Sequence, residues 1–211
     1  MIRVERFVNQ LMTSNCFVVI DDEVKRCICI DPASEKSERE IDLIEEKGFT
    51  LDYILLTHEH TDHTWGVNAL LDKYPSAKVI CSKLCKEALP LEAKTYFLLY
   101  YDDPNYSYSV KRVDFTTEDL NGHLVWCRHD IKFIATPGHS PGSICIAIDN
   151  IVFGGDTLMP FKPFIKKRNG GSVELFHESV KKMAAAFPDN TIIYPGHGEE
   201  LKFDEWRCLY E

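Results

Sequence analysis

The chain has 211 residues, of which 45% are hydrophobic and 27% are charged, and its formal net charge is −9. This length suits one domain with a buried core, and the acidic balance argues against a nucleic-acid binder, which favours a basic surface. No apolar run approaches the roughly 18 to 20 residues of a membrane-spanning helix, and the first residues lack a signal-peptide pattern. We therefore expect a single domain over residues 1–211 that is cytoplasmic and binds neither nucleic acid nor a membrane.

The first half of the chain predicts alternating strands and helices. Strands are expected over residues 2–7, 15–20, 25–30, 53–56 and 78–81, and helices over 66–74 and 83–89. The first strand is typical of a sheet edge, and the apolar run 53–56 is typical of a strand buried on both faces. A further helix is expected to begin at Ser37, with Glu40 completing a capping box, and to end at Gly48.

The second half is richer in strands. They are expected over residues 124–127, 132–136, 143–148, 151–153 and 191–194, with an amphipathic helix over 173–187 and one short helix over 203–210. No internal repeat or low-complexity linker interrupts the pattern. Because β-rich halves are separated by helices, we expect two sheets packed face to face with helices outside.

The chain contains eight cysteines. Because it lacks a secretory signal, mostly buried thiols are expected rather than disulfides. Cys27 and Cys29 alternate along a predicted strand and would share one face. Neither that pair nor Cys81 and Cys85 has the C-x-x-C spacing typical of a structural zinc site. A structural zinc site made of these cysteines is therefore not expected.

Four metal-binding side chains fall within six residues, where the apolar run 53–56 ends. They are His58, His60, Asp62 and His63. On a helix they would point in different directions, and on a strand the last would be separated from the others, so we expect a loop in which all four converge. Imidazole and carboxylate suit a borderline divalent ion such as zinc. The sequence therefore predicts a metal site at this point.

Three later motifs share one design, a strand followed by a sharp turn and a polar residue. They place His139 in Thr-Pro-Gly-His-Ser-Pro-Gly, Asp156 in Gly-Gly-Asp-Thr and His197 in Tyr-Pro-Gly-His-Gly. The glycines allow close backbone approach. Each Pro-Gly-His is a weak signal alone, but with the first run these motifs supply five histidines and two aspartates at strand ends. Together they predict one metal centre with seven ligands.

His-x-His-x-Asp-His and these three motifs resemble the metallo-β-lactamase superfamily, and within it the glyoxalase II-like branch. The match in order and context spans about residues 15–199. The resemblance implies an α+β fold, the four-layer αββα sandwich. It also implies that the metal site lies at one edge, between the two sheets.

The resemblance further implies two divalent metal ions, with Zn2+ favoured and iron or manganese as alternatives. By motif, one ion would be bound by His58, His60 and His139, the other by Asp62, His63 and His197, and Asp156 would bridge both. A hydroxide between the ions would be the nucleophile, its pKa lowered by the cations. Asp62 would orient this hydroxide and later accept its proton, which makes it the expected catalytic residue.

Three features bear on the branch of the superfamily. Enzymes with β-lactamase activity usually carry Cys or Ser where Asp156 stands, so antibiotic hydrolysis is disfavoured. Lactonases often place a tyrosine soon after this aspartate, and residues 157–160 offer none. True glyoxalase II enzymes continue into a helical region, whereas this chain ends at Glu211. The favoured interpretation is a dinuclear hydrolase of a thioester or ester.

Two alternatives remain besides a lactonase. A mononuclear iron oxidoreductase similar to the persulfide dioxygenases would use His58, His139 and Asp156. A non-catalytic, metal-stabilised binding module ranks last, because loss of catalysis usually erodes at least one ligand. The remaining histidines, His123, His129 and His177, are expected to be structural or surface groups.

Two segments bear on the substrate, which is expected to be a small molecule. Lys166, Lys167 and Arg168, with Lys162, form a basic patch in an acidic chain. We expect this patch either to bind an anionic thioester or ester or to be a solvated surface loop. The aromatic stretch from Tyr96 to Tyr108 would either cover the cleft or, as we slightly favour, form a buried or dimer-forming segment. The oligomeric state stays open.

Overall fold

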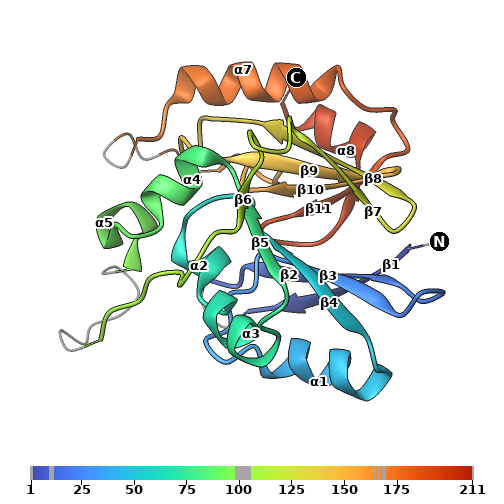
Figure 1. Ribbon diagram of the computed structural model, residues 1–211. Coiled ribbons are helices and arrows are strands. Elements are labelled where there is room, and N and C mark those ends of the chain that lie inside the picture. The colour runs from blue at the N-terminus through green and yellow to red at the C-terminus, as the bar shows by residue number, and fades with distance from the viewer. Residues whose placement is uncertain are drawn as a thin grey trace.

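Two six-stranded sheets pack face to face (Figure 1). The computed structural model describes residues 2–9, 12–97, 106–163, 165, 167 and 170–210. The first sheet has the strand order β1 (Ile2–Val8), β2 (Asn15–Asp21), β3 (Arg26–Ile30), β4 (Thr50–Leu55), β5 (Lys78–Cys81) and β6 (Phe115–Thr116). The second has the order β12 (Leu201–Lys202), β11 (Ile192–Pro195), β10 (Ile151–Gly155), β9 (Ile144–Ile148), β8 (His129–Ala135) and β7 (His123–Trp126). The strand β1 lies at an edge, as predicted.

Helices form the two outer layers (Figure 1). The first sheet is covered by α1 (Glu38–Lys47) and α3 (Val67–Lys73), and the second by α7 (Val173–Ala184) and α8 (Phe203–Cys208). Shorter helices are α2 (Thr61–Thr64), α4 (Lys83–Ala88) and α5 (Glu92–Thr95). None of the helices in the described part of the chain is long and apolar enough to cross a membrane. The layers confirm the predicted αββα sandwich.

The alternation of side chains along the strands produces the layered core. Along β2, Val18 and Ile20 face the helices of the first sheet, whereas Phe17 and Val19 face the second sheet. Phe17 meets Phe153 of β10, with ring centroids 5.3 Å apart. A third apolar cluster joins β9, β10 and β11 to α7 and α8. These three apolar clusters pack the two sheets against each other and the helices against the sheets.

Parallel pairing gathers several strand ends at one edge. In the first sheet, β3, β4 and β5 run parallel, and in the second sheet β10 and β11 do. Because the carboxyl ends of parallel strands meet at the same edge, the residues that follow them come close together. The polar residues that follow these strands are Asp31, Thr57, His58, Asp156 and His197.

The predicted capping box at Ser37 is wrong. Ser37 has a left-handed backbone with φ of 45° and makes no side-chain cap hydrogen bond to α1. Its hydroxyl instead lies 3.3 Å from the carbonyl oxygens of both Ser34 and Gly66. Partners from elsewhere in the fold have therefore replaced the local cap. Gly48 does end the helix, with φ of 66°, as predicted.

The run of predicted ligands also differs in local structure. Asp62 and His63 lie in the helical turn α2, not in the expected loop, whereas His58 and His60 precede it. The strands β6 and β12 and the helices α2 and α5 are missing from the sequence prediction because each has four residues or fewer. Segments this short carry too little periodicity to be recognised.

All eight cysteines are free thiols, and six of them are buried, which confirms the expectation of mostly buried thiols. Cys27 and Cys29 both belong to the cluster under α1 and α3, so they share one face of β3. The Sγ atoms of Cys16 and Cys29 lie 3.5 Å apart. The exposed thiols are Cys127 and Cys208.

His129 links the two sheets. Its Nδ1 lies 2.6 Å from Oδ2 of Asp149, and its Nε2 lies 3.4 Å from Oδ2 of Asp21, at the end of β2 in the other sheet. His129 is 5% exposed, and Asp21 is fully buried. The structure thus gives His129 a structural position, whereas His123 is half exposed beside Asp130.

Replacing His129 with alanine is expected to lower the free energy of unfolding by about 2 kcal/mol, because the buried ring and its hydrogen bond with Asp149 are lost. Urea unfolding measures this change. The matched control His123→Ala removes an exposed pair with Asp130 and should change stability by less than about 0.5 kcal/mol. Equal losses of unfolding free energy in the two variants would contradict a structural role for His129.

Candidate metal centre

The first cluster of donor atoms comes from His58, His60 and His139. His58 and His60 follow β4, and His139 lies in the turn after β8. Nε2 of His58 and Nε2 of His139 lie 3.1 and 3.0 Å from Nδ1 of His60. All three donor atoms lie within 4.8 Å of one another, so these residues could hold one metal ion. The spacing suits tetrahedral nitrogen ligands about 2 Å from a central ion.

The second cluster comes from Asp62, His63 and His197. Oδ2 of Asp62 lies 3.7 Å from Nε2 of His63 and 3.4 Å from Nε2 of His197. These donor atoms also lie within 4.8 Å of one another. The helical turn α2 presents Asp62 and His63, and the turn after β11 presents His197. This cluster could hold a second ion.

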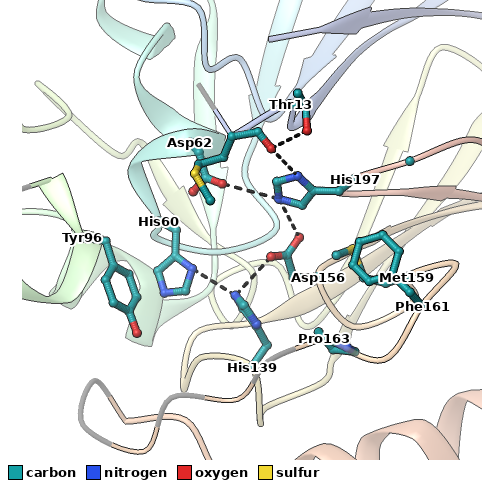
Figure 2. A pocket seen from close by; sticks show the side chains of 12 residues that line it. Thr13, His60, Asp62, Tyr96, His139, Asp156, Met159, Phe161, Pro163 and His197 are labelled. Atoms are coloured by element: carbon teal, nitrogen blue, oxygen red, sulfur yellow. Dashed lines mark hydrogen bonds and ion pairs between the residues drawn. The ribbon is translucent and has the colours of Figure 1, made fainter. Parts of the chain in front are cut away.

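Asp156 lies between the two clusters (Figure 2). Its Oδ2 is 3.2 Å from Nε2 of His139, while its Oδ1 is 3.4 Å from Nε2 of His63 and 3.6 Å from Nε2 of His197. One carboxylate oxygen thus faces each cluster. A Cβ at Gly196 would come within 2.2 Å of Oδ1, so only glycine leaves room for this carboxylate.

The donor set fits divalent metal ions. Nε2 of His63 and Oδ1 of Asp156 are buried and have no hydrogen-bond partner among the described residues. Orphaned buried polar atoms are costly unless something satisfies them. Five imidazoles and two carboxylates are ligands that zinc, iron and manganese all accept. A cation in the second cluster would satisfy both orphaned atoms.

The protonation states favour binding of cations. Burial and the neighbouring imidazoles hold the pKa of His58 well below its ordinary value. For Asp62, burial would raise the pKa, but His63 and other nearby histidines lower it overall. For His63, burial would lower the pKa, but Asp62 and Asp156 raise it to about 10. The carboxylates therefore attract positive charge, and a metal ion would displace a proton from His63.

Asp31 orients two of the predicted ligands through hydrogen bonds, and the sequence did not predict this role. Its Oδ2 accepts hydrogen bonds from Thr57 Oγ1 at 2.6 Å and from His63 Nδ1 at 3.1 Å. Its Oδ1 accepts one from the Thr57 backbone at 2.8 Å. Because Thr57 donates to Asp31, its hydroxyl oxygen accepts from His58 Nδ1 at 3.0 Å. These bonds fix both histidine tautomers so that Nε2 points toward the donor clusters.

His197 is oriented in a similar way. Its Nδ1 donates to the carbonyl oxygen of Met12 at 3.0 Å, which leaves Nε2 free for a metal. Ser14 of the same β1–β2 segment pairs in an isolated bridge with His197. No polar pattern in residues 12–14 pointed to this role. The signal that could have identified Asp31 is its place directly after a buried strand, which it shares with His58 and Asp156.

Replacing Asp31 with alanine is expected to weaken metal binding about 10- to 100-fold, because the rings of His58 and His63 lose the partner that orients them. Competition with a chromogenic chelator measures the change in affinity. Asp72→Ala, which removes an exposed carboxylate on α3, is the control. Unchanged affinity in the Asp31 variant would contradict the supporting role.

A cavity of about 500 Å³ opens over the donor atoms. His60, Asp62, His139, Asp156 and His197 reach its floor (Figure 2). His58 and His63 are more deeply buried and do not line it. A small molecule in this cavity would meet Asp62 and Asp156 together.

The aromatic stretch divides between two roles. Tyr96 lines the cavity, with its ring centroid 4.5 Å from that of His60. Phe97 stacks on Tyr106 and Tyr108 at 5.6 and 6.4 Å, and Tyr108 donates to a carbonyl oxygen of α2. Residues 98–105 lie outside the described part. One end of the stretch therefore reaches the cavity, whereas Phe97 and Tyr108 are buried and Ser107 is exposed.

The basic patch is only partly described. Lys166 and Arg168 lie outside the described residues, whereas Lys167 is exposed and does not line the cavity over the donor atoms. Lys162 lines a separate cavity beside α7, together with Lys181. The described residues thus give no contact between the predicted basic patch and the donor clusters.

Paired donor clusters at the strand ends of a four-layer αββα sandwich define the class to which this chain belongs. Residues 10–197 match the family model of the metallo-beta-lactamase superfamily, and the chain is a member of that family. The chain is also 26% identical over 196 residues to a protein of Bacillus velezensis described as a probable polyketide biosynthesis zinc-dependent hydrolase, BaeB. That match covers 90% of this chain and 75% of the relative.

Solved structures share the fold. The crystal structure of the BLEG-1 B3 metallo-beta-lactamase has a TM-score of 0.81 at 24% identity, covering 96% of this chain and 95% of that one. The crystal structure of ETHE1 from Myxococcus xanthus has a TM-score of 0.70 at 22% identity, covering 96% and 80%. These likenesses establish the architecture, and the activity must be argued from the site.

Proposed function

We propose that this protein is a dinuclear metal-dependent hydrolase of a thioester or ester, of the glyoxalase II-like type. One ion would be held by His58, His60 and His139, the other by Asp62, His63 and His197, with Asp156 shared. The observation that carries the proposal is the shared carboxylate, whose two oxygens face different donor clusters at 3.2 and 3.4 Å. A carboxylate whose two oxygens face different donor clusters suits two ions bound side by side.

The bound ions would lower the pKa of water and polarise the scissile carbonyl. The chain supplies the remaining functions. Asp62 is 4% exposed and lines the cavity, so the oxygen of its carboxylate that does not face the donor atoms of His63 and His197 can orient the attacking water and accept its proton. Asp31 and Thr57 hold the histidine rings in place, so that little reorganisation is needed during the reaction.

Zinc is the proposed metal. The donor set of nitrogen and oxygen atoms suits zinc, and the relative BaeB is described as a zinc-dependent hydrolase. Iron and manganese bind similar ligands, so the metal loaded in the cell depends on supply as well as on geometry.

A second candidate is a mononuclear iron oxidoreductase. The contact of 3.2 Å between His139 and Asp156, with His58 beside them, would suffice for one iron site. The fold of ETHE1 is compatible with this candidate. Asp62, His63 and His197 would then be ligands without a metal, although they are buried and mutually oriented. Their arrangement favours the hydrolase.

Hydrolysis assays of the chelator-treated and zinc-reloaded full chain test the proposal. Thioester, ester and lactone substrates are compared, with oxygen uptake on a persulfide as the competing activity. We expect thioester or ester hydrolysis that is lost on metal removal and restored by about two equivalents of zinc. Iron-dependent oxygen uptake without hydrolysis would establish the oxidoreductase instead.

A further inference from the structure

The cavity over the donor clusters has apolar walls. Besides the five predicted ligands on its floor, its lining includes Met12, Tyr96, Met159, Phe161 and Pro163. These residues come from the β1–β2 segment, from the end of α5 and from the segment after β10. These wall residues thus come from three separate parts of the chain. Only the segment after β10 also supplies a predicted ligand, Asp156.

Tyr96 stands beside His60, while Met159, Phe161 and Pro163 stand on the side of Asp156 and His197 (Figure 2). Any molecule whose carbonyl lies over the donor atoms would therefore touch an apolar wall. Thioether and aromatic surfaces of this kind adapt to flexible hydrocarbon chains. The cavity volume of about 500 Å³ is in the range of pockets that enclose small ligands.

The wall formed by Met159 and Phe161 is held in place. Met159 is 4% exposed, and the backbone carbonyl of Phe161 accepts a hydrogen bond of 3.3 Å from Tyr210. Pro160 packs so close to Gly198 that a Cβ there would meet its ring at 2.7 Å. The ring of Phe161 is nevertheless 49% exposed. The mouth of the cavity therefore presents exposed apolar surface. A ligand that covers this surface removes it from water, which favours binding.

The charged side chains of the described lining bear on whether the substrate is anionic. Within the described part of the chain, the lining of the cavity contains no lysine or arginine. Lys162 turns to the separate cavity beside α7, and Lys167 lines neither.

We propose that the cavity binds an uncharged, apolar acyl chain, so that the substrate class is a neutral acyl thioester or ester. This inference rests on the proposed function and narrows it. It differs from the anionic substrate expected from the basic patch, of which Lys166 and Arg168 lie outside the described residues. The apolar chain would lie against Met159 and Phe161 while the carbonyl lies over the donor clusters.

The test compares N-acetylcysteamine thioesters carrying acetyl, butyryl, hexanoyl and succinyl groups, using the zinc-loaded full chain. Because each buried methylene contributes up to about fourfold, kcat/KM should rise at least about thirtyfold from acetyl to hexanoyl. In the succinyl group a carboxylate replaces the terminal methyl group of butyryl. The kcat/KM for the succinyl thioester should be at least about tenfold lower than that for the butyryl thioester. Phe161→Ala should reduce the ratio of hexanoyl to acetyl turnover about fivefold or more.

Val125→Ala is the matched control, because this valine is 57% exposed on β7 and outside the cavity. It should leave the hexanoyl-to-acetyl ratio unchanged. Hydrolysis without a chain-length preference, or with succinyl preferred, would overturn the inference while the proposed function stands.

A binding measurement separates the two proposals if no thioester is hydrolysed. Isothermal calorimetry compares the non-hydrolysable thioethers S-hexyl- and S-(3-carboxypropyl)-N-acetylcysteamine. Tighter binding of the hexyl compound, with a negative heat-capacity change, would support the apolar cavity even though the proposed function had failed. Equal binding, or tighter binding of the carboxylate, would overturn the inference.

Discussion

Asp156→Asn is expected to abolish hydrolysis, lowering kcat/KM by about 10⁴-fold or more, and to release bound metal. Asparagine keeps the shape of the side chain, but only its oxygen can act as a ligand, and it carries no charge. The carboxylate now places one oxygen 3.2 Å from His139 and the other 3.4 Å from His63. The amide can serve one cluster at most, so the second loses a ligand and both lose a neutralising charge.

Asp130→Asn is the matched control for this change. It removes an exposed carboxylate from β8 of the same sheet and should leave metal content and turnover unaffected. Thermal unfolding of both variants confirms that they fold. An Asp156→Asn protein that keeps two ions and full turnover would show that the two clusters are not joined through this residue.

Asp62→Asn is expected to lower kcat about 10²- to 10⁴-fold, the range usual for loss of a positioned proton acceptor. Oδ2 of Asp62 lies 3.4 Å from His197 and faces the cavity. The backbone around it is held independently, since Ser14 donates to its carbonyl oxygen. The variant should therefore fold normally, and the first donor cluster should keep its ion.

Asp72→Asn on α3 provides the control for Asp62, because its carboxylate pairs only with the exposed Lys111 among the described contacts. The comparison with Asp156→Asn is also informative. Loss of Asp62 should remove at most one ion, whereas loss of Asp156 should affect both clusters. Full turnover in the Asp62 variant would contradict its role as proton acceptor.

The sequence predicted the ligands of the centre because chemistry and spacing coincide there. His58, His60, Asp156 and His197 follow strands that belong to parallel pairs, which brings these strand ends together. His139 follows β8, which runs in the same direction as β10 because both pair antiparallel with β9. The helical turn that carries Asp62 was not foreseen, because four residues show no periodicity. The donor atoms nevertheless converge, since a short turn and a loop can present the same side chains.

The supporting residues were harder to predict. The sequence predicted no role for Asp31 in the centre, although its two oxygens accept hydrogen bonds from Thr57 and His63. Nothing in the sequence says which distant groups a buried carboxylate will meet. The same limit explains the error at Ser37, whose hydroxyl bonds to Gly66, far away in the chain, instead of capping its own helix.

The residues that line the cavity could not be predicted from the sequence for the same reason. A run of basic residues is visible in the sequence, but the cavity lining depends on the tertiary fold. Met12, Tyr96 and Phe161 come from separate segments and give no joint signal in one dimension. Their apolar character became relevant only once the fold placed them around one cavity.

The metal content of the purified chain tests the central claim most directly. Elemental analysis by mass spectrometry should find about two ions per chain in the native protein, with zinc favoured, and one or none in Asp156→Asn. A single iron per chain, retained with unchanged affinity after His197→Ala, would contradict the two-metal centre.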